Sequence, residues 1–142
     1  MGRIDTVTIT MKITQKANVL HVEKPEGTIV DYYLFPEYEI HYNEQVPGAT
    51  QTWHHHEKIW ETLFIIDGEL TAQWKENGEI KTQIVEAGDV IETERTPHTF
   101  INHTDKTVKF LVIKQMLKGE DYKEILKTDK IIVNKSRYIM ES

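Results

Sequence analysis

The feature that most constrains the fold is a series of short segments in which apolar and polar residues alternate. Residues 7–13, 38–42 and 70–74 alternate in this way, and Asp67-Gly68 and Asn77-Gly78 lie between such segments. Successive side chains of a strand point to opposite faces, so alternation indicates half-buried strands. Asp-Gly and Asn-Gly pairs favour tight hairpins. Because turn signals recur about every 8–12 residues, the sequence predicts an all-β fold, an antiparallel jelly-roll sandwich or barrel.

The two ends of the chain lead to separate expectations. The alternating residues near the N-terminus predict a strand over residues 5–14. Such a strand can pair with a partner subunit, so we expect a homodimer. Near the C-terminus the period changes, and Tyr122, Ile125 and Leu126 predict one short helix over about residues 119–128.

Composition bounds the size and class of the protein. The 142 residues fit a single domain over residues 1–142, long enough to bury a core. The net charge of −6 disfavours nucleic acid as a partner, because phosphate binding needs clustered Lys and Arg. No apolar run approaches the roughly 20 residues of a membrane span, and the start lacks a signal segment. We therefore expect a cytoplasmic protein without a membrane partner. The absence of cysteine excludes thiolate metal ligands and a cysteine nucleophile.

Side chains of the metal-binding types cluster in the middle of the chain: His54, His55 and His56, followed by Glu61. If the histidines lie on a strand, His54 and His56 project to one face and His55 to the other. Glu61 rejoins the first pair from the next strand if residues 57–60 form the turn. Two imidazoles and a carboxylate that converge on one point suit a divalent metal.

Two motifs give the chain a resemblance to a known family. The first is Gly48-x5-His54-x-His56-x4-Glu61-x6-Gly68, and the second is Gly88-Asp89, then Pro97, then His98-x3-Asn102. They resemble the two motifs of the cupin superfamily, and the resemblance covers about residues 35–117. The chain departs from the family in the loop of residues 92–97, where ETERTP replaces the usual Pro-x-Gly. The resemblance implies a β-barrel with a metal held in its mouth.

With the resemblance, the candidate metal ligands become four: His54, His56, Glu61 and His98. Three neutral imidazoles and one carboxylate leave a bound divalent ion with about one net positive charge. This donor set suits Fe, Mn, Ni, Zn, Co or Cu, and ligand type alone does not choose among them. We therefore expect one divalent transition metal as the cofactor, with His55 solvated or supporting the site without binding the ion.

The resemblance does not imply one reaction, because cupins include dioxygenases, isomerases and sugar-binding regulators. We expect a small metalloenzyme that acts on a small organic substrate, with dioxygenase-type chemistry if the metal is Fe(II). Isomerase-type chemistry on a sugar or keto acid is the competing reaction, and it fits Mn, Zn or Ni. The alternative is a non-catalytic, metal-dependent barrel that binds a small molecule or a sugar.

Candidate catalytic residues follow from these reactions. Isomerase-type chemistry needs a general base inside the barrel, and the candidates are His41, Tyr42 and Tyr38. Arg95 lies in the altered loop and can hold a carboxylate or phosphate through two hydrogen bonds. Its other interpretation is a surface arginine that pairs with a neighbouring glutamate. Further residues that lie close to the ligands in sequence, and could contact a substrate or a ring nitrogen, are Gln51, Glu57 and Thr99.

Overall fold

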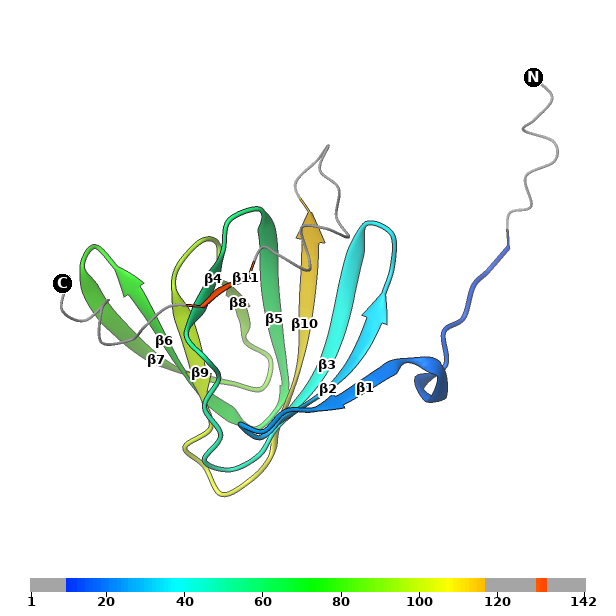
Figure 1. Cartoon of the computed structure of the whole chain (residues 1–142). Coiled ribbons are helices and arrows are strands. Elements are labelled where there is room, and N and C mark those ends of the chain that lie inside the picture. The colour runs from blue at the N-terminus through cyan, green and yellow to red at the C-terminus, as the bar shows by residue number, and fades with distance from the viewer. Residues whose placement is uncertain (1–9, 117–129, 133–142) are drawn as a thin grey trace.

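The computed structural model describes residues 10–116 and 130–132, which form two facing antiparallel β-sheets (Figure 1). The first sheet has the strand order β1 (Leu20–Glu23), β2 (Thr28–Leu34), β3 (Tyr38–Gln45), β10 (Val108–Met116), β5 (Ile59–Asp67) and β8 (Val90–Glu92). The second sheet has the order β11 (Lys130–Ile132), β4 (His54–His56), β9 (His98–Ile101), β6 (Glu69–Glu76) and β7 (Glu79–Glu86). A 3-10 helix, η2 (Lys16–Asn18), precedes β1. The predicted all-β, antiparallel jelly-roll fold is confirmed.

Strands that are distant in sequence become neighbours in both sheets. In the first sheet, β10 pairs with β3 on one side and with β5 on the other. In the second sheet, β9 pairs with β6 and β4, and this brings the second motif beside the first. The crossing of the chain between the two sheets thus places both motifs at one point of the sandwich.

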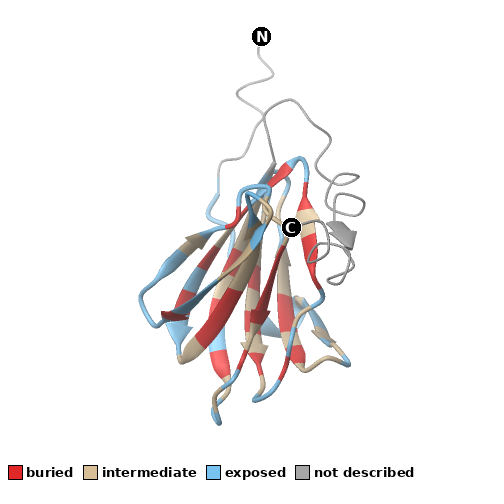
Figure 2. Ribbon diagram, turned by 90° about the vertical axis from the view of Figure 1, so that its left-hand side faces the viewer, coloured by how far each residue is buried: buried red, intermediate tan, exposed pale blue. Residues whose placement is uncertain are grey.

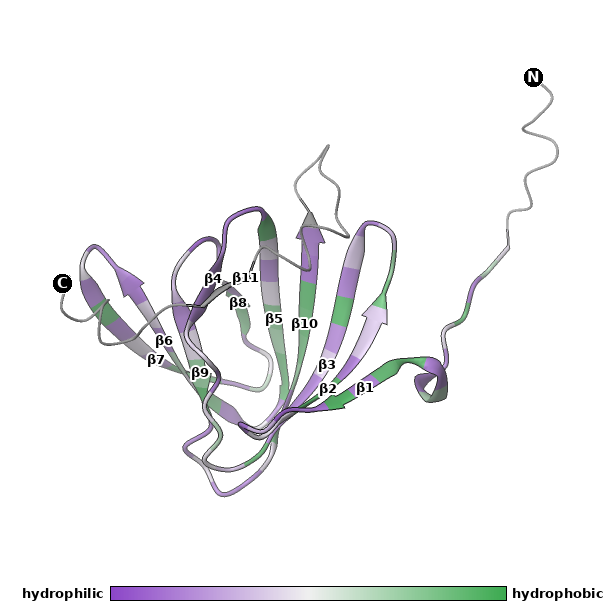
Figure 3. Cartoon of the chain, in the orientation of Figure 1, coloured by the Kyte–Doolittle hydropathy of each residue, from purple (hydrophilic) through white to green (hydrophobic). Residues whose placement is uncertain are grey.

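The core lies between the two sheets and follows the predicted alternation. Figure 2 shows buried and exposed residues alternating along the strands, and Figure 3 shows the matching alternation of hydropathy. The first sheet contributes inward residues such as Leu63, Ile65 and Phe110, and the second contributes Leu70 and Phe100. Burying each such side chain stabilises the fold by about 1.5–3 kcal/mol.

The predicted hairpin signals join neighbouring strands. Asn77 and Gly78 connect β6 to β7 with φ of 51° and 79°, as a two-residue hairpin with both central residues in the left-handed region requires. Gly68 connects β5 to β6 with φ of 94°, and a Cβ there would lie 3.2 Å from the backbone of Val108. Glycine is therefore needed at position 68 for space as well as for conformation.

The structure describes the two ends of the chain only in part. Residues 10–14 of the predicted strand over residues 5–14 are exposed and belong to no strand, and residues 5–9 lie outside the described part. The predicted helix over residues 119–128 also lies outside the described residues. Strands β1 and β11 are additional to the predicted ones. The described part contains no helix with the length and apolar character needed to cross a membrane.

Candidate metal centre

Three candidate ligands meet between the two sheets. His54 on β4 and His98 on β9 are paired residues of adjacent strands, with ring centroids 4.6 Å apart. Glu61 reaches them from β5 in the opposite sheet, and its Oε1 lies 3.1 Å from Nε2 of His98. One ligand atom from each of these buried residues lies within 4.8 Å of the others, so the group could hold a metal ion.

The protein backbone sets the orientation of both imidazoles. Nδ1 of His54 donates a hydrogen bond to the carbonyl of Thr52 at 2.8 Å, and Nδ1 of His98 donates to the carbonyl of Thr96 at 2.7 Å. A carbonyl only accepts, so each ring carries a proton on Nδ1 and has Nε2 as the atom for the centre, where a bound ion would take the place of any Nε2 proton. This arrangement is the one that metal-binding histidines use, and the residues present fit a divalent transition metal.

Glu61 supplies the negative charge of the centre. Burial by itself raises the pKa of this carboxyl group, but the neighbouring imidazoles of His56 and His98 and the charge of Lys114 hold its pKa well below the usual range. Glu61 is therefore a carboxylate at neutral pH. A buried carboxylate among imidazoles attracts a cation, which would remove the unfavourable burial of its charge.

His56 lies beside this close group. It is almost fully buried, its Nε2 is 3.5 Å from Oε2 of Glu61, and its ring centroid is 5.3 Å from that of His54. His55 alternates with both neighbours and its Nδ1 lies 3.4 Å from the carboxylate of Glu57. The alternation along β4 thus places His54 and His56 on the side of the centre and directs His55 to the other face.

Buried polar side chains hold the segment before β4 against β9. The amide of Gln45 donates to the carbonyls of Ala49 and Phe100 at 2.8 and 2.9 Å. The hydroxyl of Thr99 donates to the carbonyl of Gln51 at 2.6 Å. These bonds fix the path of the chain into β4, and so place His54 opposite His98. The roles of Gln45 and Thr99 are thus structural, because both side chains bond to the backbone.

Asn102, the last residue of the second motif, has a similar role. Its amide donates to the carbonyl of Gln45 at 2.9 Å and to that of Lys106 at 2.7 Å, while its Oδ1 accepts from Thr104. Such a fully buried and fully bonded asparagine shapes a turn and contributes no ligand. It fixes the end of β9 against β3.

The loop of residues 92–97, which departs from the cupin pattern, still positions His98 at the centre. The backbone N–H of Thr93 donates to the carbonyl of Glu61 at 3.1 Å, and that of Thr96 donates to the carbonyl of Thr93. Glu94 stands in this tight turn with φ of 50°, a conformation that glycine adopts more easily. The turn places the Thr96 carbonyl within hydrogen-bonding distance of Nδ1 of His98.

A small cavity opens beside the centre, and we call it the inner cavity. It has a volume of about 50 Å³ and is lined by His54 and Glu61, together with His41 and Lys114. Nζ of Lys114 lies 3.8 Å from Oε2 of Glu61. No sequence motif marks Lys114, although its spacing from the buried Val112 on the same strand indicates an inward side chain.

His41, a predicted base, lines the inner cavity. Its Nε2 lies 2.7 Å from Oε1 of Glu39, and both side chains are largely buried. Burial lowers the pKa of His41, and the bond to Glu39 only partly opposes that shift. His41 is therefore neutral at pH 7, with its Nε2 proton donated to Glu39 and Nδ1 left as the proton acceptor.

The other predicted catalytic residues lie elsewhere. Tyr42 points to the face opposite His41, where its hydroxyl donates to Glu44 at 2.9 Å. Burial and this bond raise its pKa to about 12. Tyr38 is exposed and stacks on Phe35. Tyr42 and Tyr38 are both outside the residues that line the inner cavity.

Arg95 is exposed at the rim of the altered loop and does not line the inner cavity. Its Nε donates to the carbonyl of Glu57 at 2.9 Å, and its guanidinium lies 5.6 Å from the ring centroid of Trp60. Gln51 lines the inner cavity, where its amide donates to Oε1 of Gln45 at 3.0 Å.

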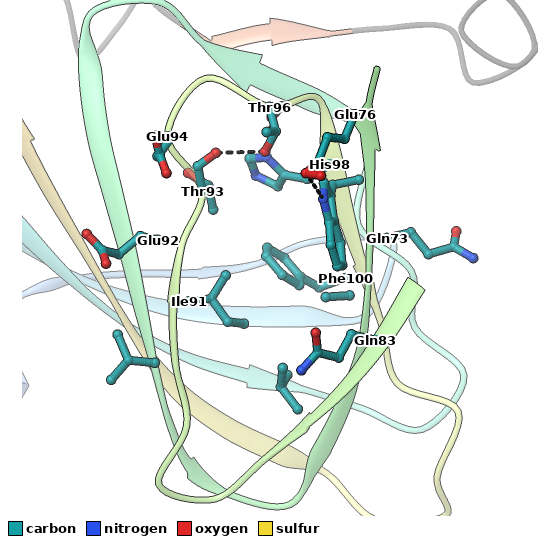
Figure 4. Close-up of a pocket in the computed structure, with 14 residues that line it drawn as sticks. Gln73, Glu76, Gln83, Ile91, Glu92, Thr93, Glu94, Thr96, His98 and Phe100 are labelled. Carbon is teal, nitrogen blue, oxygen red and sulfur yellow. Dashed lines mark hydrogen bonds between the residues drawn. The ribbon is translucent and has the colours of Figure 1, made fainter. Parts of the chain in front are cut away.

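A second and larger cavity, which we call the side cavity, reaches His98 from the other direction (Figure 4). Its volume is about 330 Å³, and it lies between β6 and β7 on one side and β8 with the altered loop on the other. Trp74, Phe100 and Ile91 form part of its wall. His98 thus borders the side cavity, and His54 and Glu61 border the inner cavity.

The fold and the site together define a jelly-roll domain with a candidate centre for a divalent metal. A family model described as "Cupin domain" matches residues 31–114, and the chain therefore belongs to the cupin family. This range is close to the one over which the motifs resemble cupins. No curated protein matches the sequence significantly.

Solved structures share the fold at low sequence identity. An oxalate oxidase aligns with a TM-score of 0.60 and 16% identity over 73% of this chain, which spans 59% of that protein's chain. A sugar phosphate isomerase of the cupin superfamily from Silicibacter pomeroyi aligns with a TM-score of 0.61 and 16% identity, over 75% of this chain and 76% of that one. The polyketide cyclase RemF from Streptomyces resistomycificus aligns with a TM-score of 0.66 and 18% identity, over 93% of this chain and 92% of that one. At these identities the likeness concerns the fold alone.

Proposed function

We propose that this cupin is a metal-dependent enzyme that transfers a proton on a small substrate with a carboxylate or keto oxygen, in an isomerase-type reaction. The observation that carries the proposal is the composition of the inner cavity. A neutral, buried histidine and an ammonium group line the same cavity as two of the candidate metal ligands. A base takes the proton and a metal or a cation stabilises the enolate oxygen, so these three groups together suit proton abstraction next to a carbonyl.

The metal would be held by His54, Glu61 and His98, with His56 as the fourth ligand predicted from the sequence. When bound, a divalent ion supplies Lewis acidity that polarises a carbonyl. The ligand types do not choose among Fe, Mn, Ni, Zn, Co and Cu.

His41 is the proposed general base. Glu39 fixes the imidazole by accepting from Nε2, so Nδ1 is the atom that takes the proton. The same bond stabilises the imidazolium that forms when the proton arrives, since Glu39 then carries the opposite charge. A base that is neutral at pH 7 and has a charged partner behind it suits proton abstraction from carbon.

Lys114 is the proposed anchor for negative charge on the substrate. Its side chain is mostly buried, and its ammonium lies in the inner cavity together with His41. An ammonium in such surroundings attracts a carboxylate or the oxygen of an enolate more strongly than one in water. The limited volume of the cavity, about 50 Å³, favours a substrate of few atoms, such as a short 2-oxo or 2-hydroxy acid.

Solvent deuterium exchange tests the proposed reaction. Protein loaded separately with Mn, Zn, Ni or Fe(II) is incubated in D₂O with short 2-oxo and 2-hydroxy acids, and loss of the C–H signal is followed by NMR. We expect exchange that the His41→Asn variant loses by at least about a hundredfold, with the metal content unchanged. The matched control is His103→Asn, because His103 is exposed. Absence of deuterium exchange with every metal would refute the proposal. Oxygen uptake by the iron-loaded protein with the same acids would support dioxygenase-type chemistry instead.

Two predictions about context accompany this function. A homodimer and a cytoplasmic location remain expectations from the sequence. Light scattering at micromolar concentration checks the first, and a monomer there would contradict it. Fractionation of cells that express the native chain checks the second.

A further inference from the structure

The side cavity differs from the inner cavity in size and in the chemistry of its wall. Its volume of about 330 Å³ falls within the ~300–1,000 Å³ range of pockets that bind small molecules. Trp74 and Phe100 supply aromatic surface, and Val85 and Ile91 supply aliphatic surface. Figure 4 shows Ile91 and Phe100 directed into the space that the strands enclose.

The charged side chains of the lining are glutamates. Glu76, Glu92 and Glu94 belong to the described lining, which contains no lysine or arginine. Figure 4 shows Glu76 close to His98, whereas Glu92 is directed away from the enclosed space. The indole Nε1 of Trp74 lies 3.4 Å from Oε1 of Glu76, so an aromatic face and a carboxylate occur side by side. A carboxylate attracts an ammonium, and an indole face adds a favourable cation–π interaction.

The charge of this wall differs from that of the inner cavity. Two lysines, Lys24 and Lys114, line the inner cavity together with Glu26 and Glu61, whereas the described lining of the side cavity has glutamates and no lysine. An anionic substrate of the proposed reaction is therefore disfavoured in the side cavity. The ligand that fits there has an apolar or aromatic body and a positive charge.

We infer that the side cavity is a second binding site, for a small aromatic amine. The aromatic body packs against Trp74 and Phe100, and the ammonium faces the carboxylate of Glu76 beside the Trp74 indole. Phe100 lies next to His98, with ring centroids 5.3 Å apart. A ligand in the side cavity therefore contacts the wall that carries this candidate metal ligand. The inference rests on the cavity and holds whether or not the proposed reaction takes place.

Three probes of equal shape and different charge test the inference. The full chain is titrated with 2-phenylethylamine, 2-phenylethanol and phenylacetate, and binding is followed by calorimetry and tryptophan fluorescence. We expect the amine to bind at least tenfold more tightly than phenylacetate, with the alcohol between them. The fluorescence change is expected to disappear in Trp74→Phe, which keeps Trp53 and Trp60 as unaffected tryptophans.

Two variants locate the site. Glu76→Gln should lower the affinity for the amine about tenfold and leave that for the alcohol unchanged. Its matched control is Glu86→Gln, which removes one exposed charge that does not line the cavity. Gln83→Trp should fill the cavity and abolish binding of all three probes, and circular dichroism shows whether this variant folds.

Several outcomes would overturn the inference. These are the absence of saturable binding by the amine, equal binding of amine and phenylacetate, or equal effects of Glu76→Gln and Glu86→Gln. The last result would mean that the net charge of the protein, and not the side cavity, attracts the amine. Because none of these readouts depends on a bound metal, they leave the test of the proposed reaction separate.

Discussion

Lys114 and Glu61 are directly paired across strands β10 and β5, with Nζ of Lys114 3.8 Å from Oε2 of Glu61. The candidate metal ligand and the proposed anion anchor are therefore neighbours on one sheet. Opposite charges at paired positions attract each other. A bound metal would compete with Lys114 for Glu61, and the ammonium would then be available to a negatively charged substrate.

Replacement of Lys114 separates its role in binding anions from any role in holding the metal. In Lys114→Met, small carboxylates such as pyruvate and glycolate should bind the zinc-loaded protein at least about tenfold more weakly, because a mostly buried positive charge is lost. Metal affinity should stay equal or rise, since one positive charge near the ion is removed. Calorimetry measures both quantities. Lys109→Met, an exposed lysine of the same strand, is the control; unchanged carboxylate binding in Lys114→Met would refute the anchor.

Removal of single imidazoles tests the metal centre. In protein purified without an affinity tag, His54→Ala and His98→Ala should each lower the content of transition metal at least tenfold, and His56→Ala should lower it too. His55→Ala should not, because His55 alternates with the ligands along β4. Elemental analysis measures the content. Equal loss in His55→Ala would mean that the assigned faces of β4 are incorrect.

Loading the metal should stabilise the fold in the same experiment. An ion present at a concentration of 100 times its dissociation constant adds about 2.7 kcal/mol to the free energy of unfolding. Thermal unfolding with and without a chelator measures this difference. The His54→Ala and His98→Ala variants should show no such difference.

The stability of the protein should depend on pH through His41. Burial lowers the pKa of His41, against the influence of Glu39, and Lys114 and Glu61 also act on it. Between this lowered pKa and the ordinary value of about 6.5, the unfolded state binds more protons than the folded state. The free energy of unfolding therefore falls as the pH drops through that window. His41→Asn should remove this part of the acid destabilisation in denaturant titrations.

NMR titration of the imidazoles checks the sign independently. The midpoint for His41 should lie below the ordinary value for histidine. The midpoint for His21 should lie above it, because Asp31 and Glu23 accept hydrogen bonds from the His21 ring and raise its pKa. A His41 midpoint above that of His21 would contradict the assigned burial.

The two glycines that enclose the first motif should differ in their tolerance of a side chain. Gly48 has φ of 81° with open space around the Cβ position, whereas Gly68 has φ of 94° and a Cβ there would lie 3.2 Å from Val108. Gly48→Ala should therefore cost about 1–2 kcal/mol for the left-handed conformation alone. Gly68→Ala should cost more, because the hairpin must also shift away from Val108. Equal losses in denaturant unfolding would show that conformation outweighs space at both positions.

The sequence was sufficient for those parts of the site that depend on local spacing. Alternation along one strand separates His54 from His55, and a short turn returns Glu61 to the same place. His98 follows from the resemblance to the second cupin motif, because no local pattern connects residues about forty positions apart in the chain. The structure explains that separation by the pairing of β4 with β9.

Other parts of the site could be placed only from the pairing of strands in three dimensions. His41 and Tyr42 are consecutive residues of a strand and cannot both face the inner cavity, so alternation alone could have removed one of them. Lys114 follows an apolar stretch and has no motif around it, and only the pairing of β10 with β5 shows that it lies beside Glu61. Ile131 and Ile132 favour a strand locally, but only the structure shows that β11 pairs with β4.

The candidate ligands come from both layers of the sandwich, since Glu61 belongs to the first sheet and His54 and His98 to the second. An ion bound among them would connect the two layers through coordinate bonds and limit how far they separate at that point. The inner cavity lies between the same layers. The extent to which it opens to solvent would therefore depend on whether the metal site is occupied. A chelator would then change how fast small molecules enter and leave the barrel, as well as what can happen to them inside.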